Sequence, residues 1–458
     1  MTDTDKIFFT ALGGGDEIGA NSFLISYKDF NLILDSGLHP RKKGKEIFPN
    51  YEDIKDLTIQ NLIITHAHND HIGALPYFLN KFPYANIYTT KPTASVAEVT
   101  LVNTAGLMER EFQFEWDTSY LKYYKEEILN IIPLIIKQID YNSKVNLKEE
   151  VKFEFTDAGH LLGSAGVLLN IENRSIYFTG DINFRQQKLI KPAVLPRHKV
   201  DVLITECTNG MQEKLPSYDS EEVRLKKFIN EITGNGGSVL IPVFALGKAQ
   251  EMLKRLSDMM TKNKIPHLPI YYSTLANALN RVYDDFNYTV RRVEKGLKLS
   301  EIPIRLLRRN DVTRGAFYKH PSIILATSGM VIEDTYSYRL AKHFLRRKDF
   351  GIAMTGYCDP ETPGYKIKNS HRYERIILDR LGSEIVDVNC RVENFTFSSH
   401  AQSEDLIKMV EKLDPEKVIL VHGDKPTIDR IGQEILERFP GKKVLAPEKL
   451  RKYEILEV

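Results

Sequence analysis

Six short apolar runs, each followed by a polar residue of the kind that binds metals or moves protons, constrain the fold of this chain most. Strands of this length, bounded by glycine and polar residues, are typical of a buried sheet. In a layered α/β fold, the carboxyl ends of such strands form the edge where ligands usually bind. The runs are Asn31–Leu34, Leu62–Thr65, Phe153–Phe155, Ile176–Thr179, Val202–Thr205 and Val418–Val421, and they lead to Asp35, His66, His160, Asp181, Glu206 and His422.

Apolar residues at helical spacing separate these runs, as expected for an α/β fold. Ser403 is predicted to cap one helix, because the acidic Glu404 and Asp405 follow in its first turn. The segment Leu121–Asn142 is interpreted as an inserted helical segment that covers the sheet. The other predicted helices are Thr93–Met108, Glu221–Ile232, Ala245–Met260, Thr335–Lys348, Glu404–Leu413 and Pro426–Phe439.

Length and composition limit the class of protein. A chain of 458 residues is long enough for two or three domains. We expect no membrane span, because no apolar run approaches roughly 18 to 20 residues, and no secretion signal, because Met1–Thr10 has no positive region followed by an apolar stretch. Cys207, Cys358 and Cys390 stand alone, which argues against a disulfide framework and fits the cytoplasm. The net charge of +2 neither requires nor excludes a nucleic-acid partner.

The densest cluster of metal-ligand residue types is His66-Ala67-His68-Asn69-Asp70-His71, directly after a predicted strand. Imidazole and carboxylate groups suit Zn²⁺, with Mn²⁺ as the alternative, and the lack of cysteine fits a catalytic site. One tetrahedral ion would be saturated by this segment alone. Two ions roughly 3.5 to 4 Å apart would also use the remaining strand-end residues. Those remaining residues are Asp35, His160, Asp181 and His422.

Several of these residues have a second interpretation when each is taken alone. His160 and Asp181 lie in glycine-containing turns, where either could serve only the turn. The same alternative applies to Asp35 and His422, although their shared position at strand ends favours a common site. The arginine clusters could follow a phosphate backbone or form a solvated face. These clusters are Arg291-Arg292, Arg305, Arg308-Arg309 and Arg346-Arg347-Lys348.

Taken together, the motifs resemble a known family. The segment from His66 to His71, followed by Gly159-His160, Thr179-Gly180-Asp181 and the late His422, resembles the metallo-β-lactamase fold of binuclear hydrolases. The long insertion before His422 resembles that of the β-CASP nucleases, and the similarity is closest to bacterial and archaeal RNases related to the endonuclease subunit of the polyadenylation cleavage factor. The segments that carry it are Ile241–Glu251, Ala326–Met330, Thr355–Tyr357, Ser398–Ala401 and Val421–Gly423.

This resemblance implies an α/β architecture, a four-layer αββα metallo-β-lactamase fold with an inserted α/β β-CASP domain. Residues 1–208 and 385–458 would form the first domain in two parts, and residues 209–384 would form the insertion. Because predicted elements run from about Lys6 to the last residues, we expect neither a KH-type extension before them nor an added domain after them.

The resemblance also implies roles for individual residues. His66, His68 and His160 would hold one divalent cation, Asp70, His71 and His422 a second, and Asp181 would bridge them. Asp35 would orient a ligand histidine. The expected catalytic residues are Asp70, Asp181, Glu206 and His400.

The implied reaction is hydrolysis of phosphodiester bonds in single-stranded RNA, during RNA processing or decay. Two cations would generate hydroxide near neutral pH, and His400 would protonate the leaving oxygen while Glu206 holds its other ring nitrogen. Ser328, Gly329 and Lys248 are expected to bind phosphate, with a simple tight turn and a surface lysine as the alternative, and Tyr357 could stack on a base or pack internally. Two segments depart from the family pattern near the expected substrate groove, Cys207–Gly210 and Cys358–Lys366.

Other functions stay open from the sequence. A β-CASP DNA nuclease is the alternative within the same class, although the DNA-repair members of the family usually lack a histidine at the position of His422, so by resemblance its presence favours RNA. A lactone or thioester hydrolase would not need the large insertion with its arginine clusters, and a non-catalytic RNA-binding subunit would not need the full ligand set. Endonuclease or exonuclease action, and assembly as a homodimer or with an RNA-processing partner, are undecided.

Overall fold

The computed structural model describes residues 5–112, 119–379 and 381–458, and within them the chain forms two compact units. Unit 1 contains residues up to 186, residues 191–214 and residues 399–458, whereas unit 2 contains residues 187–190 and 215–398. The two units are described separately below.

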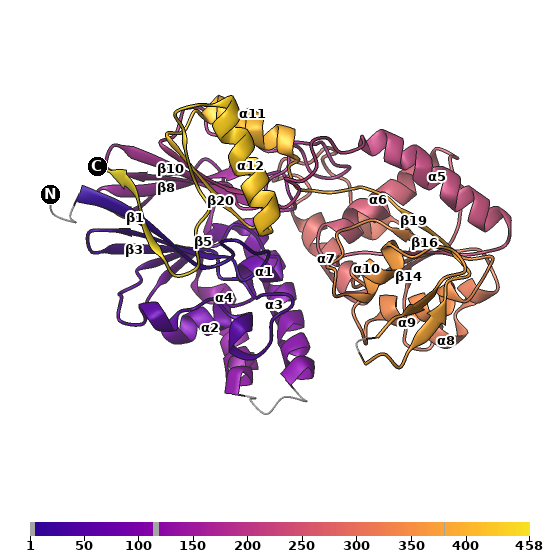
Figure 1. Ribbon diagram of the computed structural model, residues 1–458. Coiled ribbons are helices and arrows are strands. Elements are labelled where there is room, and N and C mark those ends of the chain that lie inside the picture. Colours follow the sequence, from indigo (N-terminus) through magenta and orange to yellow (C-terminus); the bar gives the residue numbers. More distant parts are fainter. Residues whose placement is uncertain (1–4, 113–118, 380) are drawn as a thin grey trace. The chain divides into compact units, whose positions relative to one another are not determined.

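Unit 1 contains two seven-stranded sheets (Figure 1). In the first sheet the order is β22-β1-β2-β3-β4-β5-β6, and strands β3 to β6 run parallel. Its strands are β1 (Lys6–Gly13), β2 (Ser22–Tyr27), β3 (Phe30–Leu34), β4 (Asn61–Ile63), β5 (Asn86–Thr90), β6 (Ile136–Ile139) and β22 (Lys452–Glu457).

The second sheet has the order β21-β20-β11-β10-β9-β8-β7. Its strands β10, β11, β20 and β21 run parallel, so their carboxyl ends lie at one edge. The strands are β7 (Val145–Lys148), β8 (Val151–Asp157), β9 (Ala165–Ile171), β10 (Arg174–Phe178), β11 (Val202–Glu206), β20 (Lys417–Val421) and β21 (Lys443–Leu445).

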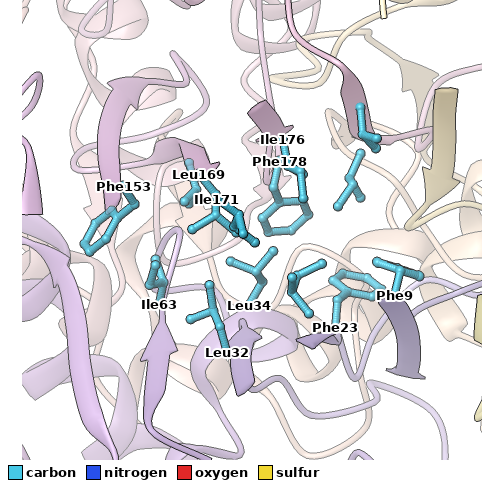
Figure 2. Close-up of a cluster of buried hydrophobic side chains, with 14 of the residues drawn as sticks. Phe9, Phe23, Leu32, Leu34, Ile63, Phe153, Leu169, Ile171, Ile176 and Phe178 are labelled. Carbon is cyan, nitrogen blue, oxygen red and sulfur yellow. The ribbon is translucent and has the colours of Figure 1, made fainter. Parts of the chain in front are cut away.

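The core of unit 1 lies between these two sheets. Figure 2 shows side chains from one sheet, such as Phe23 and Leu34, facing side chains from the other, such as Phe178 and Leu169. These side chains are almost completely buried, and removing such apolar area from water stabilises a fold by about 25 cal/mol per Å². The alternation of apolar residues along each strand therefore fixes which face points inward.

Helices cover the outer faces of both sheets. α11 (Ser403–Leu413) and α12 (Lys425–Arg438) pack on the outward side chains of β11 and β20, including Leu203 and Leu420. On the other sheet, α3 (Lys91–Phe112) contacts β5 and β6. The layers are therefore helix, sheet, sheet and helix, as expected from the sequence. The remaining helices of unit 1 are α1 (Asn69–Ile72), α2 (Leu75–Lys81) and α4 (Glu126–Ile135).

Unit 2 is built on a six-stranded parallel sheet with the order β14-β13-β15-β12-β16-β19. Its strands are β12 (Val239–Pro242), β13 (Ile270–Tyr272), β14 (Arg305–Leu306), β15 (Ile323–Ala326), β16 (Gly351–Met354) and β19 (Arg391–Asn394), with a separate hairpin of β17 (Arg375–Ile377) and β18 (Ile385–Asp387). Its helices are α5 (Tyr218–Gly234), α6 (Lys248–Thr261), α7 (Thr274–Asp285), α8 (Asp311–Arg314), α9 (Tyr336–Leu345) and α10 (Pro363–Lys368).

Three details differ from the sequence-based expectations. Ser403 is the first residue of α11, not its cap; the cap position is Gln402, and the Ser403 hydroxyl donates to Glu434. The segment Leu121–Asn142 is helical only to Ile135, because β-branched residues then continue as strand β6 beside β5. The expected division at 384/385 also differs from the change of unit at 398/399, because β19 pairs with β16 in the sheet of unit 2.

Candidate metal centre

The predicted ligand residues of unit 1 converge at the carboxyl ends of strands from both sheets. His66 and His68 follow β4, and Asp70 and His71 lie in the single turn of α1. From the other sheet, His160 follows β8, Asp181 follows β10 and His422 follows β20. Strand pairing therefore brings together residues that are separated by more than 350 positions in the chain.

The first group of ligand atoms comes from His66, His68, His160 and Asp181, which lie within 4.8 Å of one another. His68 Nδ1 is 3.2 Å from both His66 Nε2 and His160 Nε2. Asp181 Oδ2 lies 3.4 Å from His66 Nε2 and 3.6 Å from His160 Nε2. Ligand atoms of a tetrahedral Zn²⁺ with bonds of roughly 2.0–2.1 Å lie about 3.4 Å apart, so this group fits such an ion.

The second group comes from Asp70, His71 and His422. His422 Nε2 is 3.2 Å from Asp70 Oδ2, and His71 Nε2 is 3.8 Å from the same oxygen. Asp181 Oδ1 lies 3.3 Å from His71 Nε2 and 3.0 Å from His422 Nδ1. The two oxygens of Asp181 therefore point to different groups, which is the geometry that a bridging carboxylate needs.

Electrostatics distinguish the two groups. Burial lowers the pKa of His66 to about 3, assisted by the neighbouring His71. Burial also lowers the pKa values of His68 and His160, so the first group presents neutral imidazoles, the form that binds a metal. Burial alone would lower the pKa of His422 too, but Asp181 and Asp70 outweigh it and raise the pKa to about 10.

This contrast explains how the carboxylates stay charged without a cation. Burial would raise the pKa of Asp181, but His71 and His422 keep it well below its ordinary value. The pKa of His71 is well above its ordinary value because Asp181, Asp70 and Asp35 outweigh its burial. A divalent cation between these groups would take over this electrostatic stabilisation of the carboxylates.

Neighbouring groups fix the orientation of the ligand imidazoles. Asp35 accepts from His71 Nδ1 at 2.8 Å and from both the backbone N–H and the hydroxyl of Thr65, at 2.7 and 2.8 Å. His160 Nδ1 donates to the carbonyl of Ser399 at 2.8 Å. Such partners leave the opposite ring nitrogen facing the centre and make it a better ligand.

His400 and Glu206 lie beside the ligand groups. Glu206, the last residue of β11, faces His400 Nδ1 with oxygens at 2.9 and 3.1 Å, and its Oε1 also accepts from the backbone N–H of Ile182. His400 Nδ1 is 3.9 Å from Asp181 Oδ2. Burial lowers the pKa of His400, but Glu206 and Asp181 outweigh it, so the pKa lies above its ordinary value.

Asp35 and His422 adopt left-handed backbone conformations, with φ of 61° and 49°. Residues other than glycine rarely adopt this conformation, and it is concentrated at functional sites. Here it turns both side chains from the ends of β3 and β20 toward the ligand groups.

The four predicted substrate-binding residues lie in unit 2, at the carboxyl ends of neighbouring parallel strands. Ser328 and Gly329 follow β15, Tyr357 follows β16, and Lys248 is the first residue of α6 after β12. Gly329 packs against Phe244, where a side-chain carbon would lie 3.0 Å from the Phe244 backbone nitrogen. Lys248 Nζ donates to the carbonyl of Phe397, and Tyr357 is half-exposed.

The arginine clusters have different environments. Arg292 is buried and donates to the carbonyl of Tyr283, so it is neither solvated nor a phosphate contact, contrary to both sequence interpretations. Arg308 and Arg309 are exposed. Arg347 makes two hydrogen bonds to Asp349.

Sequence reasoning missed two side chains beside the second group. Asn21 is completely buried, and its Nδ2 lies 3.1 Å from His71 Nε2. The hydroxyl of Thr208 lies 3.3 Å from His422 Nδ1. Both are neutral residues next to strand ends, and neutral polar residues are too common there to be recognised without the fold.

Comparison with known families agrees with this architecture. The Metallo-beta-lactamase superfamily matches residues 15–206, the Beta-Casp domain matches residues 249–367, and the Zn-dependent metallo-hydrolase RNA specificity domain matches residues 385–447. Among the helices of the described residues, none is both long and apolar enough to cross a membrane.

Curated relatives align over nearly the whole chain. The chain is 29% identical to the endoribonuclease ysh1 of Emericella nidulans, covering 94% of this chain and 52% of the relative. It is 29% identical to cleavage and polyadenylation specificity factor subunit 3 of Dictyostelium discoideum, covering 97% and 57%. It is also 29% identical to Integrator complex subunit 11 of Gallus gallus, covering 95% and 72%. The chain thus spans little more than half the length of the first two relatives.

A solved structure shares the fold at low sequence identity. It is the crystal structure of a protein of unknown function from Enterococcus faecalis V583, with 16% identity and a TM-score of 0.59. The alignment covers 98% of this chain and 100% of that protein.

Proposed function

Since this chain belongs to the metallo-β-lactamase superfamily and carries an inserted Beta-Casp domain, we propose that it is a metal-dependent ribonuclease. One observation carries the proposal: two groups of ligand atoms share the carboxylate of Asp181. Enzymes that hydrolyse phosphodiester bonds often use two adjacent cations.

The proposed ligands are His66, His68 and His160 for one ion and Asp70, His71 and His422 for the other, with Asp181 between them. The donor set fits divalent cations, because the buried Asp181 Oδ1 has nitrogens of His71 and His422 at 3.3 and 3.0 Å but accepts no well-oriented hydrogen bond among the described residues. A buried carboxylate oxygen in that state is stabilised by a cation. The absence of cysteine from these groups favours Zn²⁺ or Mn²⁺ in a catalytic role.

When bound, the two cations would lower the pKa of a water molecule and offset the charge of the phosphoryl oxygens. His400 protonates the leaving oxygen in this proposal, through Nε2, since Nδ1 faces Glu206. Glu206 favours the protonated imidazole and fixes its orientation. Asp35 holds His71 so that Nε2 faces the centre.

RNA is the proposed substrate because the matched relatives include endoribonucleases and the last matched domain is named for RNA specificity. A single strand is proposed, and Ser328, Gly329, Lys248 and Tyr357 of unit 2 are the proposed contacts to it. The helix that starts at Lys248 supports this, because the backbone N–H groups of a helix N-terminus favour phosphate.

The proposal extends to the setting of the reaction. Relatives named as subunits of a cleavage and polyadenylation factor and of the Integrator complex support an RNA-processing partner, and a homodimer is the alternative. The three cysteines are free and buried, which supports a reducing compartment, and we propose the cytoplasm. For the family domains, as distinct from the two compact units, we propose the limits 1–208, 209–384 and 385–458, and the family match that begins at residue 385 supports the last of these ranges.

The test uses 5′-labelled RNA with either a 5′-phosphate or a 5′-hydroxyl, and DNA of the same sequence, with and without a chelator. We expect RNA cleavage that the chelator abolishes, with internal fragments from an endonuclease or single nucleotides from an exonuclease. The matched control is the double variant Asp70→Ala, His71→Ala, which should be inactive. Cleavage of DNA alone would replace RNA by DNA as the substrate, and equal activity of the double variant would overturn the proposal.

A further inference from the structure

We propose that Asn21 is a positioning residue for only one of the two cation sites, the one formed by Asp70, His71 and His422. Its loss would weaken that site and leave the site of His66, His68 and His160 intact. This inference rests on the proposed metal ligands but not on the identity of the substrate.

The first argument is contact. The Asn21 backbone N–H and its side-chain Nδ2 both donate to the carbonyl of Asp70, each at 3.0 Å. The same Nδ2 lies 3.1 Å from His71 Nε2. One asparagine therefore holds the peptide of one ligand and faces the coordinating nitrogen of the next.

The third ligand is tied to the same loop. The backbone N–H of His422 donates to the carbonyl of Gly14 at 2.9 Å. Gly14 packs directly on Asn21, where a side-chain carbon at Gly14 would lie only 2.3 Å from Asn21 Oδ1. The segment between β1 and β2 thus contacts all three ligands of the second group.

The amide orientation supports a role for the donor side. With Nδ2 facing Asp70 O and His71 Nε2, Asn21 Oδ1 is buried and has no hydrogen-bond partner among the described residues. The reverse orientation would place Oδ1 against the carbonyl oxygen of Asp70, which can only accept. A buried carbonyl oxygen that accepts no hydrogen bond lowers the stability of the fold. Asn21 nevertheless keeps the orientation in which its N–H groups face the proposed ligands.

The geometry also assigns what the donor does. Asp35 occupies His71 Nδ1, so Nε2 is the nitrogen available to a cation. In the metal-free chain the Asn21 amide faces this nitrogen and fixes its place. With a cation bound to Nε2, the amide keeps its hydrogen bond to Asp70 O and so still holds the backbone of α1. Because Asn21 is completely buried, it acts through the ligands and not on the substrate.

The first site is held by other groups. His66 Nδ1 faces the Thr65 hydroxyl at 3.1 Å, and His160 Nδ1 donates to the Ser399 carbonyl at 2.8 Å. The hydrogen bonds of Asn21 in the described part of the chain go to Asp70, His71 and Gly37. A defect at Asn21 should therefore be specific to the second site.

The test is titration of the metal-free protein with Zn²⁺, followed by calorimetry and by metal analysis after dialysis. We expect two ions per chain for the wild type. For Asn21→Ala we expect one tight ion and a second bound roughly 10- to 100-fold more weakly, the usual effect of losing a group that orients a ligand. If Asn21→Ala does not fold, the same titration is done with Asn21→Ser. The shorter serine hydroxyl cannot replace the contacts of Asn21 with both the Asp70 carbonyl and His71 Nε2.

Two comparisons separate positioning from general destabilisation. Asn31→Ala removes a similar hydrogen bond, from Nδ2 to the carbonyl of Thr58 at 3.1 Å, in a strand of the same unit, and should keep both ions. Added to His68→Ala, which removes a ligand of the first site, Asn21→Ala should weaken the remaining ion. Added to His422→Ala, which already removes a ligand of the second site, Asn21→Ala should cause no further loss of metal binding.

Two tight ions in the Asn21 variants, or equal loss of both, would overturn this inference and leave the proposed ribonuclease untouched. Selective loss of one ion would support the inference even if the wild type cleaved no RNA. The two proposals therefore fail in different ways.

Discussion

At the scale of single residues, the chemistry depends on which nitrogen of each imidazole faces the centre. His71 gives Nδ1 to Asp35, His160 gives Nδ1 to the Ser399 carbonyl, and His400 directs Nδ1 to Glu206. In each case the partner on one side of the ring determines what the other side can do. In the proposed mechanism these partners leave Nε2 of His71 and His160 for a cation and Nε2 of His400 for the leaving oxygen.

Replacing His400 tests its proposed role as the acid. We expect His400→Ala to lower kcat by about 10²- to 10⁴-fold, the usual contribution of a positioned proton donor. Metal content should stay at two ions per chain, because His400 belongs to neither proposed ligand set. Single-turnover cleavage of labelled RNA measures the effect, and a wild-type rate in the variant would exclude His400 as the acid.

Glu206 should control the pH dependence of the same step. Its carboxylate raises the pKa of His400 against the effect of burial, so the acid stays protonated to higher pH. Activity that needs the protonated form falls as the pH rises through this pKa. In Glu206→Gln the fall should move to lower pH, as measured from log kcat between pH 5 and 10. An unchanged alkaline limb would contradict this role for Glu206.

At the scale of elements, the centre depends on the close approach of two backbone segments. Gly37, after β3, lies so near α1 that a side-chain carbon there would be 1.7 Å from the Asp70 carbonyl oxygen. The backbone N–H of Ser36 also donates to the carbonyl of His71 at 2.8 Å. The loop after one strand thus shapes the ligand-bearing turn after the next.

Gly37→Ala should therefore damage both stability and metal binding. Moving a backbone carbonyl aside costs about 1–3 kcal/mol, as overpacking usually does, and displaces Asp70. Denaturant unfolding and metal analysis measure the two effects. The control is Gly106→Ala within α3, where nothing lies within 4 Å of the added carbon and a gain of about 0.5–1 kcal/mol is expected. Equal behaviour of both variants would contradict the prediction.

At the scale of the whole molecule, all the proposed ligands belong to unit 1. A cation that binds only the folded state stabilises it by about 2.7 kcal/mol at a concentration 100 times its Kd. Removing the metals should therefore speed amide hydrogen exchange in β4 and β20 while β12 and β16 of unit 2 keep their protection. Mass spectrometry of peptides with and without chelator measures this, and uniform loss of protection would count against a centre confined to unit 1.

Much of the centre is predictable because ligand chemistry is local. His66, His68, Asp70 and His71 fall within six positions after an apolar strand, and that density alone indicates a metal site. Period-two and helical patterns likewise locate most strands and helices, since they report which face is buried. The exact ends of helices were less predictable. The N-cap of α11 is Gln402 and not Ser403, and β6 begins where a helix was expected to continue.

The sequence by itself determined a layered α/β fold, the residue types of the centre and the strand ends that carry them, whereas the four-layer arrangement was an expectation from the family resemblance. Only the tertiary structure decided that Asp181 turns one oxygen toward each ligand group, that Asn21 faces His71, and that Arg292 is buried. The physical reason is that apolar periodicity is encoded within a few neighbouring positions. Contacts across two sheets depend instead on register, on strand order and on left-handed turns such as those at Asp35 and His422. These features are set by the pairing of segments that are distant in the sequence.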